Sequence, residues 1–285
     1  MSGLMAGRRG LVMGVANDHS IAWGIARRLA AEGATLCLTY QPGGVEKRVK
    51  PLAASIGCDF LVPCDVALSP DAGAPAALDE TFKAIVDRWN GLDFVVHAIA
   101  FSDRNELKGR YADTSRANFA NTMLVSCFSF TEVAKRAAPM MTRGGAMVTL
   151  TYGGSTRAMP HYNVMGVAKA ALEASVRYLA LDFGPDNIRV NAISAGPVRT
   201  LAGSGIPGAR LMFNYQQKNA PLQRTASIDE IGGTALYLLS DLGAAVTGGV
   251  HYVDAGYNII SMPALETLST QEAQAGGVLE NGNGD

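Results

Sequence analysis

Short apolar runs alternate along the chain with longer segments whose apolar residues recur at helical spacing. The short runs are continuously apolar, which is typical of strands buried on both faces of a parallel sheet. They predict seven strands, at residues 10–15, 35–40, 60–64, 93–99, 146–150, 188–194 and 249–254. Helical spacing predicts helices at residues 25–32, 78–89, 114–137, 162–181 and 229–240. This alternation predicts an α/β fold, a single Rossmann-like, doubly wound parallel sheet with helices on both faces.

The same pattern sets the limits of the domain. Residues 1–268 form one predicted domain, and the polar, glycine-rich residues 269–285 predict a disordered tail. Residues 198–218 are expected to form one long loop, and a loop of that length in a compact domain is often a lid. The helices predicted at residues 114–137 and 162–181 have more apolar surface than one sheet face needs. Helix pairing between subunits is therefore a reasonable hypothesis.

Composition narrows the class of protein. The 285 residues are 48% hydrophobic and 17% charged, which indicates a globular chain with an ample core. The formal net charge of −1 gives no electrostatic reason to expect a nucleic acid or an anionic membrane as partner. The four cysteines lack the spacing of a metal site and suit a reducing cytosol. The chain has no signal-peptide pattern and no apolar stretch long enough to span a bilayer. We therefore expect a cytoplasmic protein without a metal.

The turn after the first predicted strand is a candidate phosphate site. Gly14 lies near the end of the strand, and Ser20 and Gly24 precede the predicted helix. Such a strand–turn–helix unit directs backbone N–H groups and a helix N-terminus at a pyrophosphate. Ser20 could cap the helix and offer its hydroxyl to phosphate. The spacing is not GxGxxG, so an ordinary loop capped by Ser20 is an equally good interpretation.

The ends of the second and third predicted strands carry candidate nucleotide contacts. Gln41 occupies the position at which a dinucleotide fold reads the ribose. An amide can hydrogen-bond a ribose but cannot neutralise a 2′-phosphate, so NADH is favoured over NADPH. Lys47 and Arg48 follow closely and keep NADPH open. Asp65 could accept a hydrogen bond from the adenine amino group with Val66 packed on the ring, or Asp65 could only cap a turn.

Two tyrosines and a lysine form the candidate catalytic group. Tyr152 follows a predicted strand, Tyr162 lies at the start of a predicted helix, and Lys169 comes seven residues later. Seven residues make two helical turns, so Tyr162 and Lys169 can face one cleft at the carboxyl end of the sheet. A phenol beside a fixed cation suits hydrogen bonding to a carbonyl that gains negative charge. The alternative is a helix-starting tyrosine and a solvated lysine. The apolar residues around Lys169 argue against it, because an unpaired buried charge is costly.

The motifs with diagnostic spacing are Gly14-x5-Ser20-Ile-Ala-x-Gly24, HAIAFSD at residues 97–103, Tyr152, Tyr162-x6-Lys169 and GPVRTLA at residues 196–202. Together they resemble the bacterial NADH-dependent enoyl-[acyl-carrier-protein] reductases of type I, a divergent branch of the short-chain dehydrogenases/reductases. The resemblance covers residues 3–263.

The tyrosine spacing separates this branch from most other short-chain dehydrogenases, which carry Tyr-x3-Lys and a Ser thirteen residues before the Tyr. Here Gly166 is the fourth residue after Tyr162, and Thr149 lies thirteen residues before it. The usual NNAG run is replaced by HAIA at residues 97–100. These departures argue against a carbonyl reductase of the wider superfamily. A dinucleotide-binding regulator without catalysis is a second alternative, although such proteins usually lose the Tyr or the Lys.

The resemblance implies NADH as cofactor, an enoyl-acyl carrier protein as substrate and a homotetramer. It implies that Tyr162 hydrogen-bonds the thioester carbonyl, that Lys169 holds the nicotinamide ribose, and that Tyr152 is the second tyrosine of the site. Residues implied to border NADH are Gly14, Ser20, Ile21, Gln41, Asp65, Val66, Ile99, Lys169, Val198, Arg199, Thr200, Leu201 and Ala202. Residues implied to touch the acyl chain are Ser102, Tyr162, Met165, Ile206 and Met212.

The predicted lid departs from the family pattern. Relatives are expected to have a basic cluster just after the Ser-Gly-Ile, where it helps to hold the acidic carrier protein. Here Ile206 is followed by Pro207, and only Arg210 remains of that cluster. Ala209 replaces a bulky aromatic residue. Carrier docking and chain-length preference are therefore left open by the sequence, whereas the predicted chemistry is unaffected.

Overall fold

A seven-stranded parallel sheet in the order β3-β2-β1-β4-β5-β6-β7 forms the centre of the molecule. The computed structural model describes residues 3–67, 77–198, 200 and 208–263. The strands are β1 (Arg9–Met13), β2 (Thr35–Tyr40), β3 (Phe60–Pro63), β4 (Phe94–His97), β5 (Gly145–Thr151), β6 (Ile188–Ala195) and β7 (Val250–Val253). The predicted doubly wound fold is confirmed, because each predicted strand is present within a few residues of its expected bounds.

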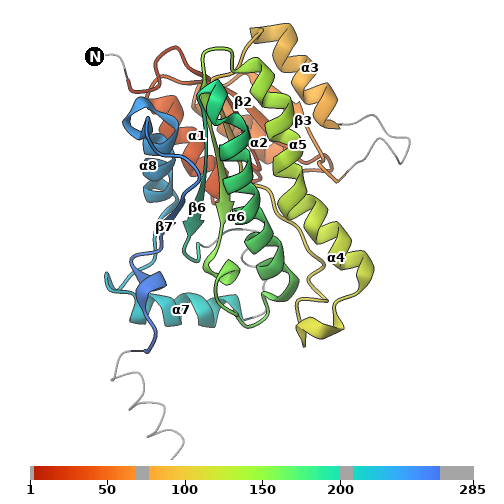
Figure 1. The fold of residues 1–285 in the computed structure, drawn as a ribbon, viewed down its shortest axis with the longest axis vertical. Helices are drawn as coiled ribbons and strands as arrows, with labels where there is room; N and C mark the ends of the chain where they lie inside the picture. Colours follow the sequence, from red (N-terminus) through yellow and green to blue (C-terminus); the bar gives the residue numbers. More distant parts are fainter. Residues whose placement is uncertain (1–2, 68–76, 199, 201–207, 264–285) are drawn as a thin grey trace, which may run out of the picture.

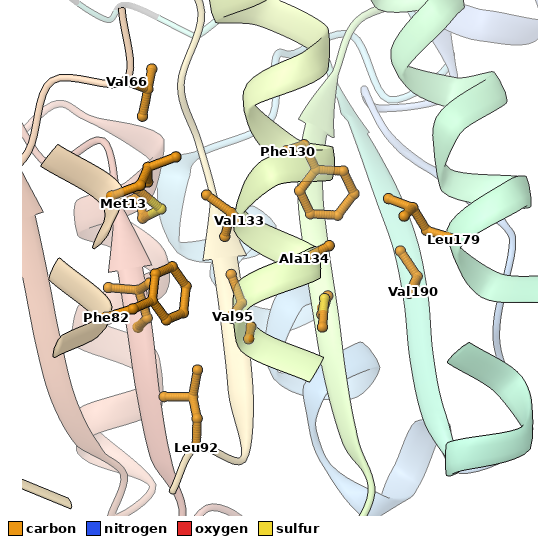
Figure 2. Packing of buried hydrophobic residues seen from close by; sticks show 14 of the residues in the cluster. Met13, Val66, Phe82, Leu92, Val95, Phe130, Val133, Ala134, Leu179 and Val190 are labelled. Atoms are coloured by element: carbon orange, nitrogen blue, oxygen red, sulfur yellow. The ribbon is translucent and has the colours of Figure 1, made fainter. Parts of the chain in front are cut away.

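Helices cover both faces of this sheet (Figure 1). They are α1 (Ile21–Ala31), α2 (Glu46–Ser55), α3 (Ala77–Trp89), α4 (Arg116–Met123), α5 (Ser129–Ala137), α6 (Asn163–Phe183), α7 (Ala209–Asn219) and α8 (Ile228–Leu239). Successive residues of β1 enter different cores: Leu11 and Met13 pack under α3, α5 and α6, whereas Val12 packs under α1, α2 and α8. This alternation explains the continuously apolar strand runs. Figure 2 shows Phe130 and Val133 of α5 over the first of these cores.

Three elements differ from the sequence-based expectations. Helix α2 was not expected, because its helical segment is polar and contains Pro51. The single helix predicted at residues 114–137 is interrupted by a π-helical segment, Leu124–Phe128, between α4 and α5. The loop predicted at residues 198–218 is wrong in its second half, which forms α7 at the lower end of the molecule (Figure 1). The predicted tail at residues 269–285 lies outside the described residues.

The sheet changes winding direction between β1 and β4. Strand β1 pairs with β2 on one side and with β4 on the other, and Met13 is aligned with His97. In open α/β sheets ligands bind beyond the carboxyl ends of the strands at such a switch point. Behind it, α1 and α8 cross closely at Gly24 and Gly232, where a Cβ would collide with the facing helix. None of the helices in the described part of the chain has both the length and the apolar character that crossing a membrane requires.

Candidate active site

The turn after β1 is shaped by a glycine that no other residue can replace without strain. Gly14 has φ of +100°, and a Cβ at this position would collide with the carbonyl oxygen of Ala98 beyond β4. Ser20 precedes α1 but makes no side-chain cap, so the predicted capping role is wrong. Its Oγ instead accepts hydrogen bonds from the backbone N–H groups of Ala16 and Asn17, each at 3.1 Å. The positive φ of Gly14 sets the course of this turn at the switch point, where a pyrophosphate approaches the backbone in dinucleotide folds.

Gln41 and Asp65 meet at the ends of β2 and β3. Gln41 Nε2 donates to Asp65 Oδ2 at 3.3 Å, and Asp65 Oδ1 accepts from the backbone N–H of Ala67 at 3.0 Å. Asp65 therefore caps a turn, as the alternative interpretation proposed, while it also lies beside the candidate ribose contact. Val66 is buried next to it. A carboxylate bound to Gln41 disfavours a second negative group, such as a 2′-phosphate, at this edge.

Tyr152 and Tyr162 face each other across the end of β5. Their ring centroids are 5.1 Å apart with an interplanar angle of 70°, an edge-to-face arrangement. Tyr162 is buried and immediately precedes α6, whereas Tyr152 is half-buried. Burial raises the pKa of the Tyr162 phenol, and Tyr152 and Glu173 raise it further. Burial also raises the pKa of Tyr152 to about 12. Both phenols therefore remain protonated near neutral pH and can act as hydrogen-bond donors.

Lys169 is buried on α6 and finds its partner on the neighbouring strand. Its Nζ donates to the carbonyl oxygen of Leu150 at 2.7 Å. Burial lowers the pKa of Lys169 to about 8, and the groups that oppose this shift are Cys127 and Glu173. The alternative of a solvated lysine is therefore wrong. A buried ammonium with one carbonyl partner has donor capacity left for a further acceptor such as a ribose hydroxyl.

The residues expected to touch an acyl chain are brought together only in part. Met165 packs with Tyr162, Val164 and Leu107 in a small apolar cluster, separate from the two main cores. Met212 is half-buried on α7. Ser102 is buried, and its hydroxyl is engaged with two residues of α4: it donates to Asn118 Oδ1 at 3.3 Å and accepts from Thr122 Oγ1 at 2.9 Å. The Ser102 side chain is thus tied to α4.

The candidate cofactor loop after β6 is described in part. Val198 packs against the core beneath α1 and α8, and the backbone N–H of Thr200 donates to the Val198 carbonyl at 2.8 Å. Ile21 and Ile99 are half-buried at the ends of their turns. Four expected site residues lie outside the described residues: Arg199, Leu201, Ala202 and Ile206.

Two buried polar groups near the site were missed by the sequence reasoning. His97, at the end of β4, is fully buried between Thr149 Oγ1 at 3.1 Å and Ser129 Oγ at 2.9 Å. Burial lowers the pKa of His97 to about 3, and the charge of Lys169 acts in the same direction. Glu173, one turn after Lys169, accepts a hydrogen bond from Thr151 Oγ1 at 2.6 Å. The only signal in the sequence was a polar residue within an otherwise apolar run.

Comparison with known proteins assigns the family. A family profile described as "Enoyl-(Acyl carrier protein) reductase" matches residues 14–258, which span the Gly14 turn, both tyrosines and Lys169. The chain belongs to the enoyl-acyl carrier protein reductase family. The resemblance drawn from the motif spacing is thereby confirmed.

Close relatives within the enoyl-acyl carrier protein reductase family match over most of their length. "Enoyl-[acyl-carrier-protein] reductase [NADH] 2" of Rhizobium meliloti (strain 1021) is 66% identical over 96% of this chain and 100% of that protein. The crystal structure of FabI from Candidatus Liberibacter asiaticus has a TM-score of 0.88 and 57% identity, and covers 93% of this chain and 100% of its own. The reductase from Anaplasma phagocytophilum in complex with NAD has a TM-score of 0.87 and 54% identity, and covers 93% and 99%.

Proposed function

We propose that this chain reduces the trans-2 double bond of enoyl-acyl carrier protein thioesters with NADH. This reaction is the last reductive step of the type II fatty-acid elongation cycle. The observation that carries the proposal is the placement of Tyr152, Tyr162 and Lys169 around the carboxyl end of β5, where the two rings are in contact and Lys169 binds the Leu150 carbonyl, in a chain with Tyr-x6-Lys spacing. The relative from Rhizobium meliloti is named for the same reaction.

The proposed roles follow from the protonation states and positions of these residues. NADH, when bound, supplies the hydride that reduces the β-carbon of the substrate. Tyr162 donates its phenolic hydrogen bond to the thioester oxygen, which gains negative charge as the α,β-unsaturated bond is reduced. Burial keeps this phenol protonated, so the donor is present at neutral pH. Tyr152 supports the Tyr162 ring by its edge-to-face contact.

Cofactor binding is proposed to involve the turn at Gly14, the Gln41–Asp65 pair and Lys169. Gly14, packed against the Ala98 carbonyl, sets the course of the turn that is proposed to approach the pyrophosphate, and Gln41 with Asp65 offers hydrogen bonds without positive charge at the adenosine ribose. Lys169 binds the nicotinamide ribose with donor capacity not used by Leu150. Four contacts are proposed from the family pattern alone: those of residues 199, 201 and 202 with NADH and that of Ile206 with the acyl chain.

The decisive assay follows NADH oxidation with crotonyl-CoA and a longer trans-2-enoyl thioester, beside a panel of ketones. We expect turnover with the enoyl thioesters and none with the ketones. The ratio of kcat/KM for NADH to that for NADPH should exceed one. Reduction of ketones without reduction of enoyl thioesters would favour the carbonyl reductase alternative, and NADH binding without any turnover would favour the regulator.

The partners and the compartment are also proposals. We infer that the chain forms a homotetramer and works in the cytoplasm on an acyl carrier protein. In support of subunit pairing, several large apolar side chains near α4 and on α6 are exposed in the single chain: Phe128 is 52%, Tyr178 70% and Leu181 73% exposed. Sedimentation velocity should give the mass of four chains. Replacing Tyr178 and Leu181 by Lys should give smaller species, and an unchanged mass would place the interface elsewhere.

A further inference from the structure

Two consecutive residues at the end of β5 bind two charged side chains of α6. The Leu150 carbonyl accepts from Lys169 Nζ at 2.7 Å, and Thr151 Oγ1 donates to Glu173 Oε1 at 2.6 Å. Both members of the second pair are buried, since Thr151 is 4% and Glu173 7% exposed. Burial of a carboxylate is costly unless it is compensated by hydrogen bonds or charge. The roles proposed for the tyrosines and the lysine leave this buried carboxylate unexplained.

The Thr151–Glu173 pair lies close to both Lys169 and Tyr152 in the sequence of its two elements. Glu173 follows Lys169 by four residues, so the two side chains lie on the same face of α6, one turn apart. Thr151 immediately precedes Tyr152. The Thr151–Glu173 hydrogen bond therefore fixes the end of β5 against α6. On the strand it lies next to Tyr152, and on the helix it lies one turn from Lys169.

The charges around Lys169 give the carboxylate a second role. Among the described residues, Cys127 of the π-helical segment and His97 of β4 interact electrostatically with Lys169, and Tyr162 lies two turns away at the start of α6. Burial raises the pKa values of Cys127 and Tyr162 and lowers that of His97 to about 3, so all three are neutral near pH 7. Glu173, one turn further along α6, is the acidic side chain among these groups, and its charge opposes the lowering of the Lys169 pKa by burial.

We propose that Glu173, held by Thr151, is a positioning residue that keeps Lys169 protonated and in place for binding the cofactor. The proposal rests on the function proposed for Lys169 as a ribose ligand. Glu173 acts through Lys169 and needs no contact with substrate or cofactor. The hydroxyl of Thr151 orients the Glu173 carboxylate, and the backbone carbonyl of Leu150 orients the Lys169 ammonium. The end of β5 therefore fixes the positions of both side chains.

The test is the pH dependence of NADH binding to Glu173→Gln. Lys169 binds while protonated, so affinity of the wild-type protein should fall as pH rises through about 8, the lowered pKa of Lys169. Removing the negative charge of Glu173 lowers that pKa further. We therefore expect the fall in affinity to begin about one pH unit lower in the variant, with affinities near wild type at pH 6. Fluorescence titration of NADH, without substrate, gives the dissociation constant at each pH.

Variants of the threonines on β5 supply matched controls. Thr151→Val removes the donor to Glu173 and should shift the binding curve in the same direction, whereas Thr151→Ser keeps the hydroxyl and should restore it. Thr149→Val removes another buried hydroxyl of the same strand, which bonds His97 and not α6. It should lower the thermal midpoint without moving the pH curve. If Glu173→Gln does not fold, the valine and serine variants at position 151 make the same test.

Two results of the NADH titration would contradict a positioning role for Glu173. Weaker NADH binding by the same factor at every pH would show that Glu173 only supports the fold, and would overturn the proposal. An unchanged curve would overturn it as well. The binding titration is independent of turnover. A wild-type protein that binds NADH but reduces no enoyl thioester would therefore contradict the proposed function, while the shift in Glu173→Gln would still be measured.

Discussion

The turn after β1 and the end of β5 both present candidate site residues at the same edge of the sheet, yet they are held in place by different means. The first is fixed by backbone conformation: Gly14 has a positive φ and lies against the carbonyl of Ala98. The second is fixed by buried polar contacts between β5 and α6, from Lys169 to Leu150 and from Thr151 to Glu173. One region depends on a missing side chain, and the other on side chains that must be present.

This difference explains why the two regions tolerate change differently. A conformational constraint at a glycine is local, and it is broken by any added Cβ. A buried hydrogen bond joins residues far apart in the sequence, and it is lost when either partner is truncated, which leaves the other unsatisfied. The first region should therefore fail by steric strain, and the second by altered electrostatics at the candidate catalytic group.

The largest effect is expected for Gly14→Ala. The left-handed backbone and the collision with Ala98 together should lower the free energy of unfolding by about 2–4 kcal/mol and abolish measurable NADH binding. Gly43→Ala is a matched control, because Gly43 has φ of +103° but no atom within 4 Å of an added Cβ. It should cost only about 1–2 kcal/mol. Denaturant unfolding measures both, and equal losses would show that the approach to Ala98 is unimportant.

The next effect concerns the β5 region. Tyr162→Phe keeps the buried ring against Tyr152 but removes the donor to the developing oxyanion. Turnover should fall about ten- to a thousandfold, as for loss of one oxyanion donor, with NADH affinity little changed. Tyr152→Phe keeps the same ring contact and should cost less. Steady-state kinetics with an enoyl thioester makes the comparison, and wild-type turnover in Tyr162→Phe would remove this phenol from the mechanism.

The same contrast determines what the sequence could reveal. Continuously apolar runs predicted all seven strands, because the inner strands are buried on both faces, and even the half-buried edge strand β7 has an apolar run. Gly14 was found because a glycine at a strand end signals a tight turn. Tyr162 and Lys169 were found from helical periodicity. These features are all local, so one stretch of sequence is enough to show them.

What the sequence could not reveal depends on distant contacts. Helix α2 was missed because half of its residues are polar, and because Pro51 counts against a helix. The hydroxyl of Ser20 was assigned to its own helix, whereas the folded loop brings the N–H groups of Ala16 and Asn17 closer. The Thr151–Glu173 bond joins residues 22 positions apart, and its burial follows only from packing of α6 on the sheet.

A third prediction tests the buried polar residues around His97, near the candidate catalytic group. His97 has a pKa of about 3 in the folded chain, against about 6.5 when unfolded. The unfolded chain therefore binds an additional proton between these values, so stability is lost as pH falls from about 6.5 towards 3. This one group should contribute about 1.4 kcal/mol per pH unit. His97→Gln, which cannot titrate, should flatten the curve of unfolding free energy against pH. An unchanged slope would show that His97 is protonated in the fold.

The smallest expected effect concerns α7, which is held beside the end of β7 by a buried hydrogen bond from Gln216 to the Asp254 carbonyl. Arg210 is exposed there and forms no ion pair within the part of the chain that the structure describes. If an acidic carrier protein docks beside the acyl site, a rim charge should act on encounter rate and salt dependence. Arg210→Glu should then raise KM for enoyl-carrier substrate by about two- to fivefold at low salt, with little effect on enoyl-CoA.

Lys218, on the last turn of α7, provides the matched charge reversal, because it too is exposed but lies two turns after Arg210. Lys218→Glu should change KM for the carrier substrate less than Arg210→Glu does. The effect at Arg210 should shrink as salt rises, since screening shortens the reach of exposed charges. Kinetics on the carrier and CoA substrates at two salt concentrations distinguishes carrier docking at Arg210 from a general disturbance of α7. Equal losses on carrier and CoA substrates would mean that the substitution disturbs α7 itself, and no loss on either would place carrier docking on another surface.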